Sequence, residues 1–280
     1  MRYGISTHLY HRTRLTRAHL EDIASFGFEA VEVFATRSHV DYHDPAALDA
    51  VAGWFSELGL RLHGIHGPIM EGYGAGDRWE GKKFSIAAPD QAQRQEAVRE
   101  TILALELARR VPAEVLVLHL GYPRGVQSAL PANAHDAALR SLEEIHAAAR
   151  PLGLRLAIEV IPNELSTPDA LVRLLEDDLP VAEAGICLDF GHAFLLGDVV
   201  DAVEQISGHL ISTHVHDNDQ RTDSHLAPFE GRIDWASALI AVQKVGYEGT
   251  LLLELADTST PREVLDKARK VRGRFDGMLI

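Results

Sequence analysis

Short apolar runs rich in β-branched residues alternate with longer segments of helical period along the whole chain. Eight runs are expected to be strands: Arg2–Ser6, Ala30–Phe34, Leu60–His66, Glu114–His119, Leu154–Val160, Gly185–Asp189, Leu210–His216 and Thr250–Leu255. Strands that alternate regularly with helices form βα units and a parallel sheet. The pattern therefore predicts an α/β fold.

A helix is expected after each strand. The expected helices are Arg17–Phe26, one from Pro45, one from Asp90 to about Arg110, Asn133–Arg150, one from Pro168, Val199–Ile206, one after Asp234, and Pro261–Arg274. Asp44-Pro45 and Thr167-Pro168 are typical of an N-cap followed by proline at the first helical position. The glycine-rich segment from Gly67 to Pro89 is expected to be a long loop.

These eight units run through 280 residues without a linker or a change in composition. They predict one domain, residues 1–280, folded as a single (β/α)8 TIM barrel, whose usual length is about 250 residues. A doubly wound open sheet is the alternative. The open sheet is disfavoured because no G-x-G-x-x-G follows the first strand and because eight regular βα units favour closure of the sheet into a barrel.

Composition indicates the cellular compartment in which the protein is expected. Apolar residues make up 46 % of it, yet no run approaches the roughly 18 apolar residues of a membrane span. The N-terminus enters a strand pattern without the features of a signal peptide. The single cysteine, Cys187, excludes an internal disulfide and suits a reducing compartment. We expect a cytoplasmic protein without membrane contact.

The net charge of −14 bears on possible partners. Nucleic-acid-binding proteins usually carry a basic stripe that displaces counterions from phosphates. A strongly acidic chain disfavours nucleic acid as a partner without forbidding it, since a metal cluster can supply local positive charge.

Polar, ionisable side chains gather where the expected strands end, whereas the strand interiors are apolar. They are Thr7 and His8, Glu32, His63 and His66, His119, Glu159, Asp189 with His192, His214 with His216, and Glu254. In a barrel the carboxyl ends of the strands carry the chemistry. These side chains are therefore expected to share one rim.

Singly, each of these residues has a structural interpretation. His66 could be a hydrogen-bonded structural histidine, and Glu159 or Glu254 half of a buried ion pair. Together, carboxylates about 5 Å apart repel by roughly 3 kcal/mol at an effective dielectric near 20. No lysine or arginine occupies a matching strand end. The set therefore predicts a divalent cation.

The donor types narrow the choice of ion. Three carboxylates with His214 suit an octahedral site for Mn²⁺, Mg²⁺ or Co²⁺. The additional histidines favour Zn²⁺, Mn²⁺ or Fe²⁺ and could build a second or a third site.

The motifs at the strand ends resemble a known family. They are I-H-G-P at 65–68, L-H-L-G at 118–121, I-E-V at 158–160, C-L-D-F-G-H-A-F at 187–194, H-V-H-D-N-D at 214–219 and E-L at 254–255. Together they are similar to those of the xylose isomerase-like barrels, a group that includes sugar isomerases, ketose 3-epimerases and endonuclease IV.

The sugar enzymes of this group imply one metal ion held by Glu159, Asp189, His214 and Glu254. The two glutamates would act as an acid–base pair that moves a proton through a metal-stabilised enediolate, with His192 and Glu32 contacting the substrate. The resemblance thus implies a carbohydrate-like small molecule, an ion such as Mn²⁺, Zn²⁺, Co²⁺ or Mg²⁺, and a homodimer. We make this isomerase or epimerase the first prediction.

Endonuclease IV implies the alternative, a metal-cluster phosphodiesterase or AP endonuclease. Its three-zinc cluster would add His66 and His119 beside Glu159, and a third position formed by His192, Asp223 and His225. Two departures oppose this activity: V-I-P-N follows Glu159, and His216 stands where the endonuclease has asparagine. We expect one ion, with residues for up to three, and a role for His216 in orienting the ligands.

Two further residues are candidate substrate contacts. Trp79, in the expected long loop, could stack on a sugar ring or cover the site, because a loop of this length in a compact barrel is usually functional. A packing insertion at a subunit contact is the alternative. His8, after the first strand, is the other candidate.

Overall fold

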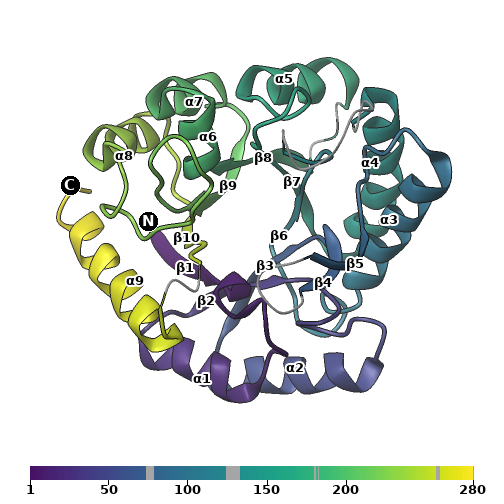
Figure 1. The fold of residues 1–280 in the computed structure, drawn as a ribbon, viewed down its shortest axis with the longest axis horizontal. Helices are drawn as coiled ribbons and strands as arrows, with labels where there is room; N and C mark the ends of the chain where they lie inside the picture. Colours follow the sequence, from purple (N-terminus) through teal and green to yellow (C-terminus); the bar gives the residue numbers. More distant parts are fainter. Residues whose placement is uncertain (74–78, 124–132, 180, 182, 257–258, 280) are drawn as a thin grey trace.

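Eight parallel strands close into a barrel with helices around it, which confirms the predicted (β/α)8 class (Figure 1). The structure, a computed structural model, describes residues 1–73, 79–123, 133–179, 181, 183–256 and 259–279. The barrel order is β1-β10-β9-β8-β7-β6-β3-β2. Its strands are β1 (Arg2–Ser6), β2 (Ala30–Phe34), β3 (Arg61–His66), β6 (Val115–Leu118), β7 (Arg155–Glu159), β8 (Ala184–Asp189), β9 (Leu210–Val215) and β10 (Thr250–Leu253).

The helices that follow the strands surround the barrel. They are α1 (Arg17–Ser25), α2 (Pro45–Leu58), α3 (Gln91–Ala104), α4 (His135–Ala149), α5 (Pro168–Arg173), α7 (Val199–Gln205), α8 (Trp235–Lys244) and α9 (Pro261–Asp276). The helix starts expected after Asp44 and Asp234 are confirmed: Asp44 accepts a hydrogen bond from the Ala46 amide at 2.9 Å, and Asp234 accepts one from the Ser237 amide at 3.2 Å. Local sequence therefore sets where these helices begin.

Three elements differ from the sequence-based expectation. The segment expected to be a loop contains a hairpin of β4 (Met70–Tyr73) and β5 (Trp79–Lys83). A short helix, α6 (Phe190–Leu196), starts directly after β8, because Asp189 caps it by accepting the His192 amide at 2.6 Å. Helix α3 ends at Ala104 instead of near Arg110, and the chain continues in tighter turns such as Leu105 N–H to the Ile102 carbonyl.

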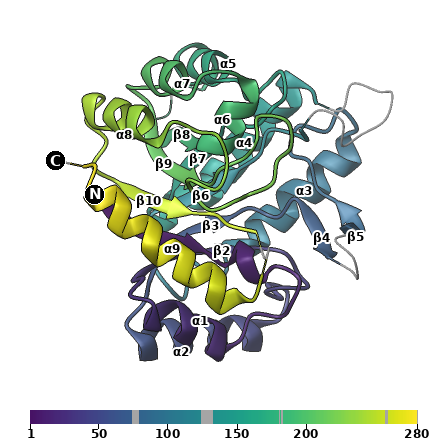
Figure 2. The same ribbon diagram turned by 60° about the vertical axis from the view of Figure 1, so that its left-hand side comes forward.

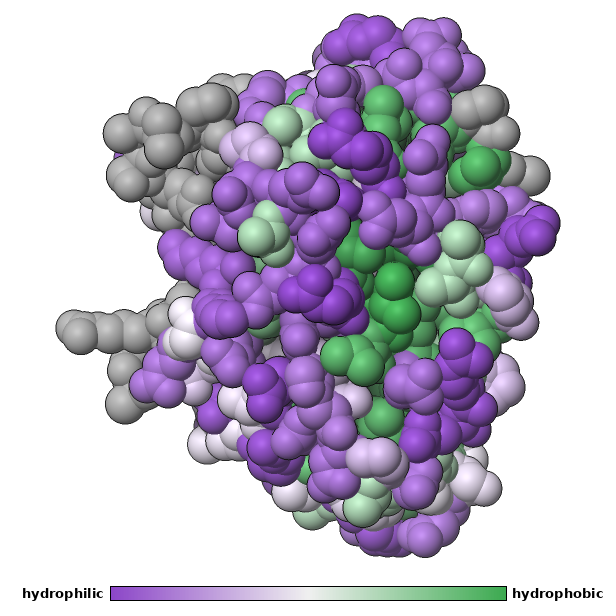
Figure 3. Space-filling model, turned by 90° about the vertical axis from the view of Figure 1, so that its right-hand side faces the viewer, coloured by the Kyte–Doolittle hydropathy of each residue, from purple (hydrophilic) through white to green (hydrophobic). Residues whose placement is uncertain are grey.

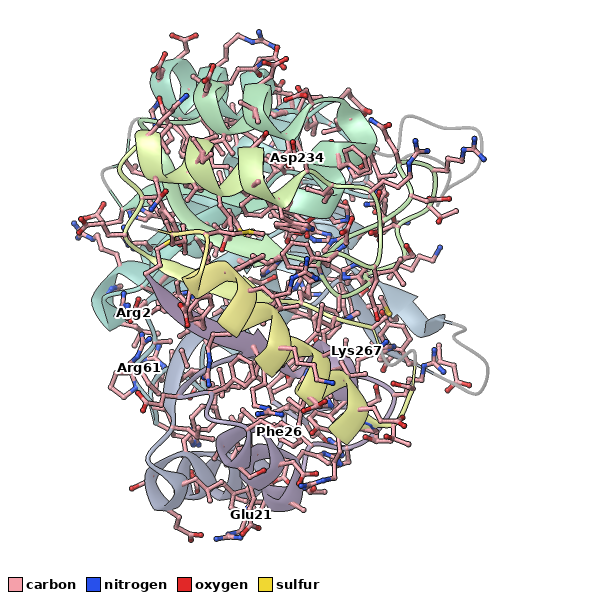
Figure 4. The ribbon with its side chains drawn as sticks, turned by 90° about the vertical axis from the view of Figure 1, so that its left-hand side faces the viewer. Arg2, Glu21, Phe26, Arg61, Asp234 and Lys267 are labelled. Atoms are coloured by element: carbon pink, nitrogen blue, oxygen red, sulfur yellow. The ribbon has the colours of Figure 1, made fainter. Side chains whose placement is uncertain are left out.

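The two ends of the barrel are chemically different. Arg2 and Arg61, at the starts of β1 and β3, lie at the same end (Figure 4) and both form ion pairs with Glu114, just before β6. Inside the barrel the strands carry buried small and apolar side chains such as Val117, Ala157 and Cys187. The polar residues of the predicted rim lie at the opposite, carboxyl end, above this packed interior. His63 is the exception: its Nδ1 lies 3.3 Å from Oε2 of Glu114 at the amino end, so its expected place on the rim is wrong.

Helix α9 crosses the side of the barrel near both termini (Figure 2). Its Lys267 forms an ion pair of 2.8 Å with Glu230, in the segment between β9 and α8 (Figure 4). The side that bears α3 and α4 is mostly polar with a central apolar area (Figure 3). Within the residues described, no helix combines the length and apolar composition that a bilayer span requires.

Candidate active site at the carboxyl end of the barrel

The strand ends bring four predicted ligands to one point. Nδ1 of His214, in β9, lies 3.3 Å from Oε1 of Glu159, 3.9 Å from Oδ2 of Asp189 and 3.4 Å from Oε2 of Glu254. These residues are at most 3 % exposed. We call them the primary group. Their arrangement follows from the parallel register, in which Asp189 pairs with His214 across β8 and β9.

Two buried atoms of the primary group face each other at 3.3 Å. Glu159 Oε1 and His214 Nδ1 lack a hydrogen bond within the described part of the chain. A buried polar atom without a partner costs about 1–3 kcal/mol. A carboxylate oxygen and an imidazole nitrogen that face one point, with two further carboxylates beside them, fit a divalent cation. The residues present therefore suit the predicted ion.

A second group shares Glu159. Oε2 of this carboxylate lies 2.9 Å from His119 Nε2 and 3.3 Å from His66 Nε2. The other ring nitrogen of His66, Nδ1, lies 2.9 Å from the Gly67 carbonyl, which can only accept a hydrogen bond. His66 therefore donates from Nδ1 to this carbonyl, which holds Nε2 directed at Glu159, as a backbone carbonyl does for metal-binding imidazoles.

A third group lies beyond Asp189 and includes His216, for which a role in orienting the ligands was expected. The ligand atoms of His192, His216, Asp223 and His225 all lie within 4.8 Å of one another. His192 comes from α6, and Asp223 and His225 come from the segment between β9 and α8. All nine residues of the predicted three-position set thus meet at one rim, and His216 joins them.

Imidazoles and carboxylates compensate one another in the site. Burial alone would raise the pKa of Glu159, but the nearby imidazoles of His119 and His214 outweigh it and hold that pKa well below its usual range. Burial likewise opposes ionisation of Asp189, yet His192 and His216 lower its pKa. Glu159 and Asp189 are therefore ionised at neutral pH, which is the form that binds a cation.

A pocket of ≈ 320 Å³ opens above these groups. Its polar lining includes Glu159, His192 and Glu254, and its apolar lining comes from Phe34, Ile69, Tyr73, Tyr122 and Pro123. The hairpin β4–β5 thus contributes to the pocket through Tyr73. A cavity with an apolar wall and a few convergent polar groups suits a small molecule.

The predicted substrate contacts fall in different places. His8 and His192 line the pocket. Glu32 does not: it is fully buried, and its Oε2 lies 3.0 Å from Nε2 of His214, so it supports a ligand from behind. Trp79 has its backbone in β5, paired with Tyr73, but its side chain lies outside the described residues. Its substrate role stays a prediction.

The sequence interpretation missed His11 and Arg12, which also line the pocket. His11 is buried, and its ring stacks on His8 with centroids 4.6 Å apart. The i, i+3 spacing of His8 and His11 after β1 was the available signal, because the short helix η1 (Thr7–Tyr10) turns both rings to one side.

Comparison with known proteins agrees with these observations. A family model described as a xylose isomerase-like TIM barrel matches residues 20–272. An uncharacterized protein of Methanocaldococcus jannaschii is 26 % identical over 275 residues, which cover 95 % of this chain and 88 % of that protein. Fructoselysine 3-epimerase of Escherichia coli O157:H7 is 23 % identical over 293 residues, covering 100 % of this chain and 98 % of the enzyme.

Solved structures share the fold along the whole chain. A D-tagatose 3-epimerase-like protein superposes with a TM-score of 0.80 at 23 % identity, covering 100 % of this chain and 98 % of that one. The IOLI protein with a bound zinc atom superposes with a TM-score of 0.80 at 16 % identity, covering 100 % and 99 %. At sequence identities of 23 % and 16 %, the similarity to these two structures shows a shared fold alone.

Proposed function

The chain belongs to the xylose isomerase-like TIM barrel family, and on this premise we propose that it is an isomerase or epimerase of a sugar-like substrate that works with a divalent metal ion. The observation that carries the proposal is the convergence of Glu159, Asp189, His214 and Glu254 below a pocket of small-molecule size. The names of two similar proteins, a fructoselysine 3-epimerase and a D-tagatose 3-epimerase-like protein, support this class of substrate.

The primary group would hold the ion, which is Mn²⁺, Zn²⁺, Co²⁺ or Mg²⁺ in this proposal. A bound divalent ion polarises a substrate carbonyl and lowers the cost of negative charge beside it. His192 and His8, both in the pocket lining, would contact substrate hydroxyls.

Glu159 and Glu254 are the proposed acid–base pair. One carboxylate takes a proton from the carbon next to the substrate carbonyl, which leaves an enediolate, and the other glutamate returns a proton to the opposite face. Two strands, β8 and β9, separate β7, which carries Glu159, from β10, which precedes Glu254. This separation supports proton transfer from two different sides of a substrate.

Solvent exchange tests the proposal directly. Candidate ketoses, incubated with the metal-loaded protein in deuterium oxide, should gain deuterium at the carbon next to the carbonyl. Glu254→Gln should abolish the exchange while the protein retains much of its metal. Glu143→Gln, an exposed glutamate of α4, is the matched control and should exchange like the wild type. Full exchange in Glu254→Gln would remove Glu254 from the acid–base pair.

A metal-cluster phosphodiesterase is the second candidate, and one observation favours it. The three ligand groups, with Glu159 shared between two of them, meet within one rim, as the resemblance to endonuclease IV implies. Hydrolysis of bis(p-nitrophenyl) phosphate and cleavage of DNA with an abasic site test this candidate. Activity on either, without deuterium exchange into ketoses, would reverse the order of the two proposals.

A further inference from the structure

Another pocket lies at the amino end of the barrel, at the opposite end from the proposed active site. It has a volume of ≈ 310 Å³, and three arginines from three different elements line it: Arg2, Arg61 and Arg272. We propose that this pocket binds a phosphate group, either on a small molecule or as free phosphate. The inference goes beyond the proposed function and does not depend on it.

The starts of neighbouring strands bring two of the arginines together. Arg2 and Arg61 are the first residues of β1 and β3, and both strands pair with β2. They lie at the same end of the molecule (Figure 4). Ala30, the first residue of β2, is the register partner of Arg61 and also lines the pocket. Because Ala30 has only a methyl side chain, the space between the two arginines stays open.

Arg272 reaches the pocket from helix α9. Its Nη1 donates a hydrogen bond of 2.6 Å to the Gly27 carbonyl, and its guanidinium lies 5.5 Å from the centroid of the Phe28 ring. A Cβ atom at Gly27 would lie 3.3 Å from both Nη atoms of Arg272, and the φ of +80° at Gly27 also favours glycine. The guanidinium is therefore positioned in advance, which lowers the entropic cost of binding.

The three guanidinium groups have few carboxylate partners. Glu114 is paired with both Arg2 and Arg61, whereas Arg272 has no carboxylate partner in the part of the chain that the structure describes. Among the described lining residues, Glu29 is the single carboxylate. The lining thus carries a net charge of +2, which Glu114 offsets in part from outside, in a chain whose net charge is −14.

The donors of the pocket fit a phosphate group. A guanidinium has five N–H donors in a planar fork that matches phosphate oxygens, and Arg272 directs one of them to a protein acceptor among the described residues. A phosphate monoester carries about −1.5 to −2 charge at pH 7 and three acceptor oxygens. These values match the net charge of the lining and its three guanidinium groups. The pocket volume also leaves room for an organic group attached to the phosphate.

A purely structural role explains less of this arrangement. The amino end of a barrel usually serves stability, but exposed ion pairs contribute little to it. The side chains of Arg2, Arg61 and Glu114 are 56 %, 38 % and 35 % exposed. Stability does not require a third guanidinium, that of Arg272, beside two that already share one carboxylate. A bound anion does.

Calorimetric titration of the full chain tests the site, with inorganic phosphate and glycerol 3-phosphate as probes at constant ionic strength. Arg61→Gln and Arg272→Gln should each weaken binding by roughly tenfold or more, because each removes a charge-assisted hydrogen-bond donor. Arg269→Gln, in the same helix as Arg272 and paired with Asp266, is the matched control and should bind like the wild type. Phosphate held by metal ions at the carboxyl end contributes equally in all variants.

Glu29→Gln gives a result that misfolding cannot imitate. Glu29 is exposed, and its replacement removes the negative charge of the lining without removing a donor. Both probes should therefore bind several-fold more tightly to Glu29→Gln than to the wild type. Glu143→Gln removes an exposed carboxylate of α4 and should leave the affinity unchanged.

The comparison of probes identifies the source of the phosphate. Tighter binding of glycerol 3-phosphate assigns the site to a phosphorylated small molecule, and equal or tighter binding of inorganic phosphate assigns it to free phosphate. Undetectable binding by the wild type, or equal affinity in the wild type, Arg61→Gln and Arg272→Gln, would overturn the proposal. None of these measurements requires turnover, so the phosphate site and the proposed epimerase can fail separately.

Discussion

The carboxylate of Glu32 lies 3.0 Å from Nε2 of His214, on the opposite side of the ring from the primary group. Both side chains are fully buried. Burial would raise the pKa of Glu32, but the imidazole of His214 outweighs it and lowers that pKa. The ionised carboxylate of Glu32 keeps the His214 proton on Nε2. The unprotonated Nδ1 is then free to bind a metal ion as a ligand.

We predict that Glu32→Gln weakens metal binding at the primary group. Carboxylates behind a ligating histidine typically contribute 10–100-fold to metal affinity, and glutamine retains the hydrogen bond while it removes the charge. We therefore expect a loss of roughly tenfold for Glu32→Gln and a larger one for Glu32→Ala. Calorimetric titration of the metal-free protein with Mn²⁺ or Co²⁺ measures the affinity of each variant for the ion, with Glu143→Gln as the control.

Removal of the metal should destabilise the protein. Four carboxylates are buried close together: Glu32, Glu159, Asp189 and Glu254. An ion that binds only the folded state, at a free concentration a thousand times its Kd, raises the free energy of unfolding by about 4 kcal/mol. The melting temperature should fall by roughly 5–10 °C after chelation. Addition of Mn²⁺ or Zn²⁺, but not K⁺, should restore it. An unchanged melting temperature would argue against a buried ion.

The buried carboxylate of Asp217 organises the segment that follows β9. It accepts five hydrogen bonds, from the amides of Asn218, Phe229, Arg232 and Ile233 and from the Trp235 indole, at 2.8–3.1 Å. An asparagine would turn an NH₂ group toward some of these donors. Asp217→Asn should therefore lower the free energy of unfolding by about 3 kcal/mol in urea. Asp219 is partly exposed, and Asp219→Asn should cost below about 1 kcal/mol.

At the other end of the barrel, Glu114 predicts a dependence on acid pH. The His63 imidazole, whose Nδ1 lies 3.3 Å from Oε2 of Glu114, lowers the pKa of Glu114 to about 2. The stabilisation is complete above the unfolded pKa of about 4.3 and disappears as the pH falls to about 2. Urea unfolding should show Glu114→Gln less stable than the wild type at pH 6, by below about 1 kcal/mol because Glu114 is partly exposed. The stability difference between Glu114→Gln and the wild type should shrink by pH 3. Glu143→Gln, the control, should show no such dependence on pH.

The β4–β5 hairpin should act on substrate binding. Tyr73 lines the pocket, and its ring lies 4.2 Å from that of His11. Loss of a contact made equally in the ground and transition states raises KM without changing kcat. Tyr73→Ala should therefore raise KM several-fold more than it lowers kcat, and we predict the same for Trp79→Ala. Tyr3→Phe, at the opposite end of the barrel, is the control. An unchanged KM in both variants would remove the hairpin from the substrate site.

The positions of the barrel strands and of most helix starts follow from the sequence. Apolar runs such as V-L-V-L at 115–118 read as strands because both faces of a parallel barrel strand are buried. Asp44 and Asp234 mark helix starts because a cap involves only neighbouring residues. Helix α6 was missed because Asp189 serves both as its cap and as a member of the primary group.

The sequence by itself also determined which residues occupy the strand ends, since that follows from strand period and position. Only the tertiary structure decided how they pair. Glu32 and His214 are 182 residues apart, and closure of the barrel brings β2 and β9 to the same rim. His216, likewise, acquires its neighbours from α6 and from the segment after β9. Such contacts depend on the register of a closed barrel and on the left-handed backbone of His225, where φ is +42°, neither of which is encoded in any short stretch of residues.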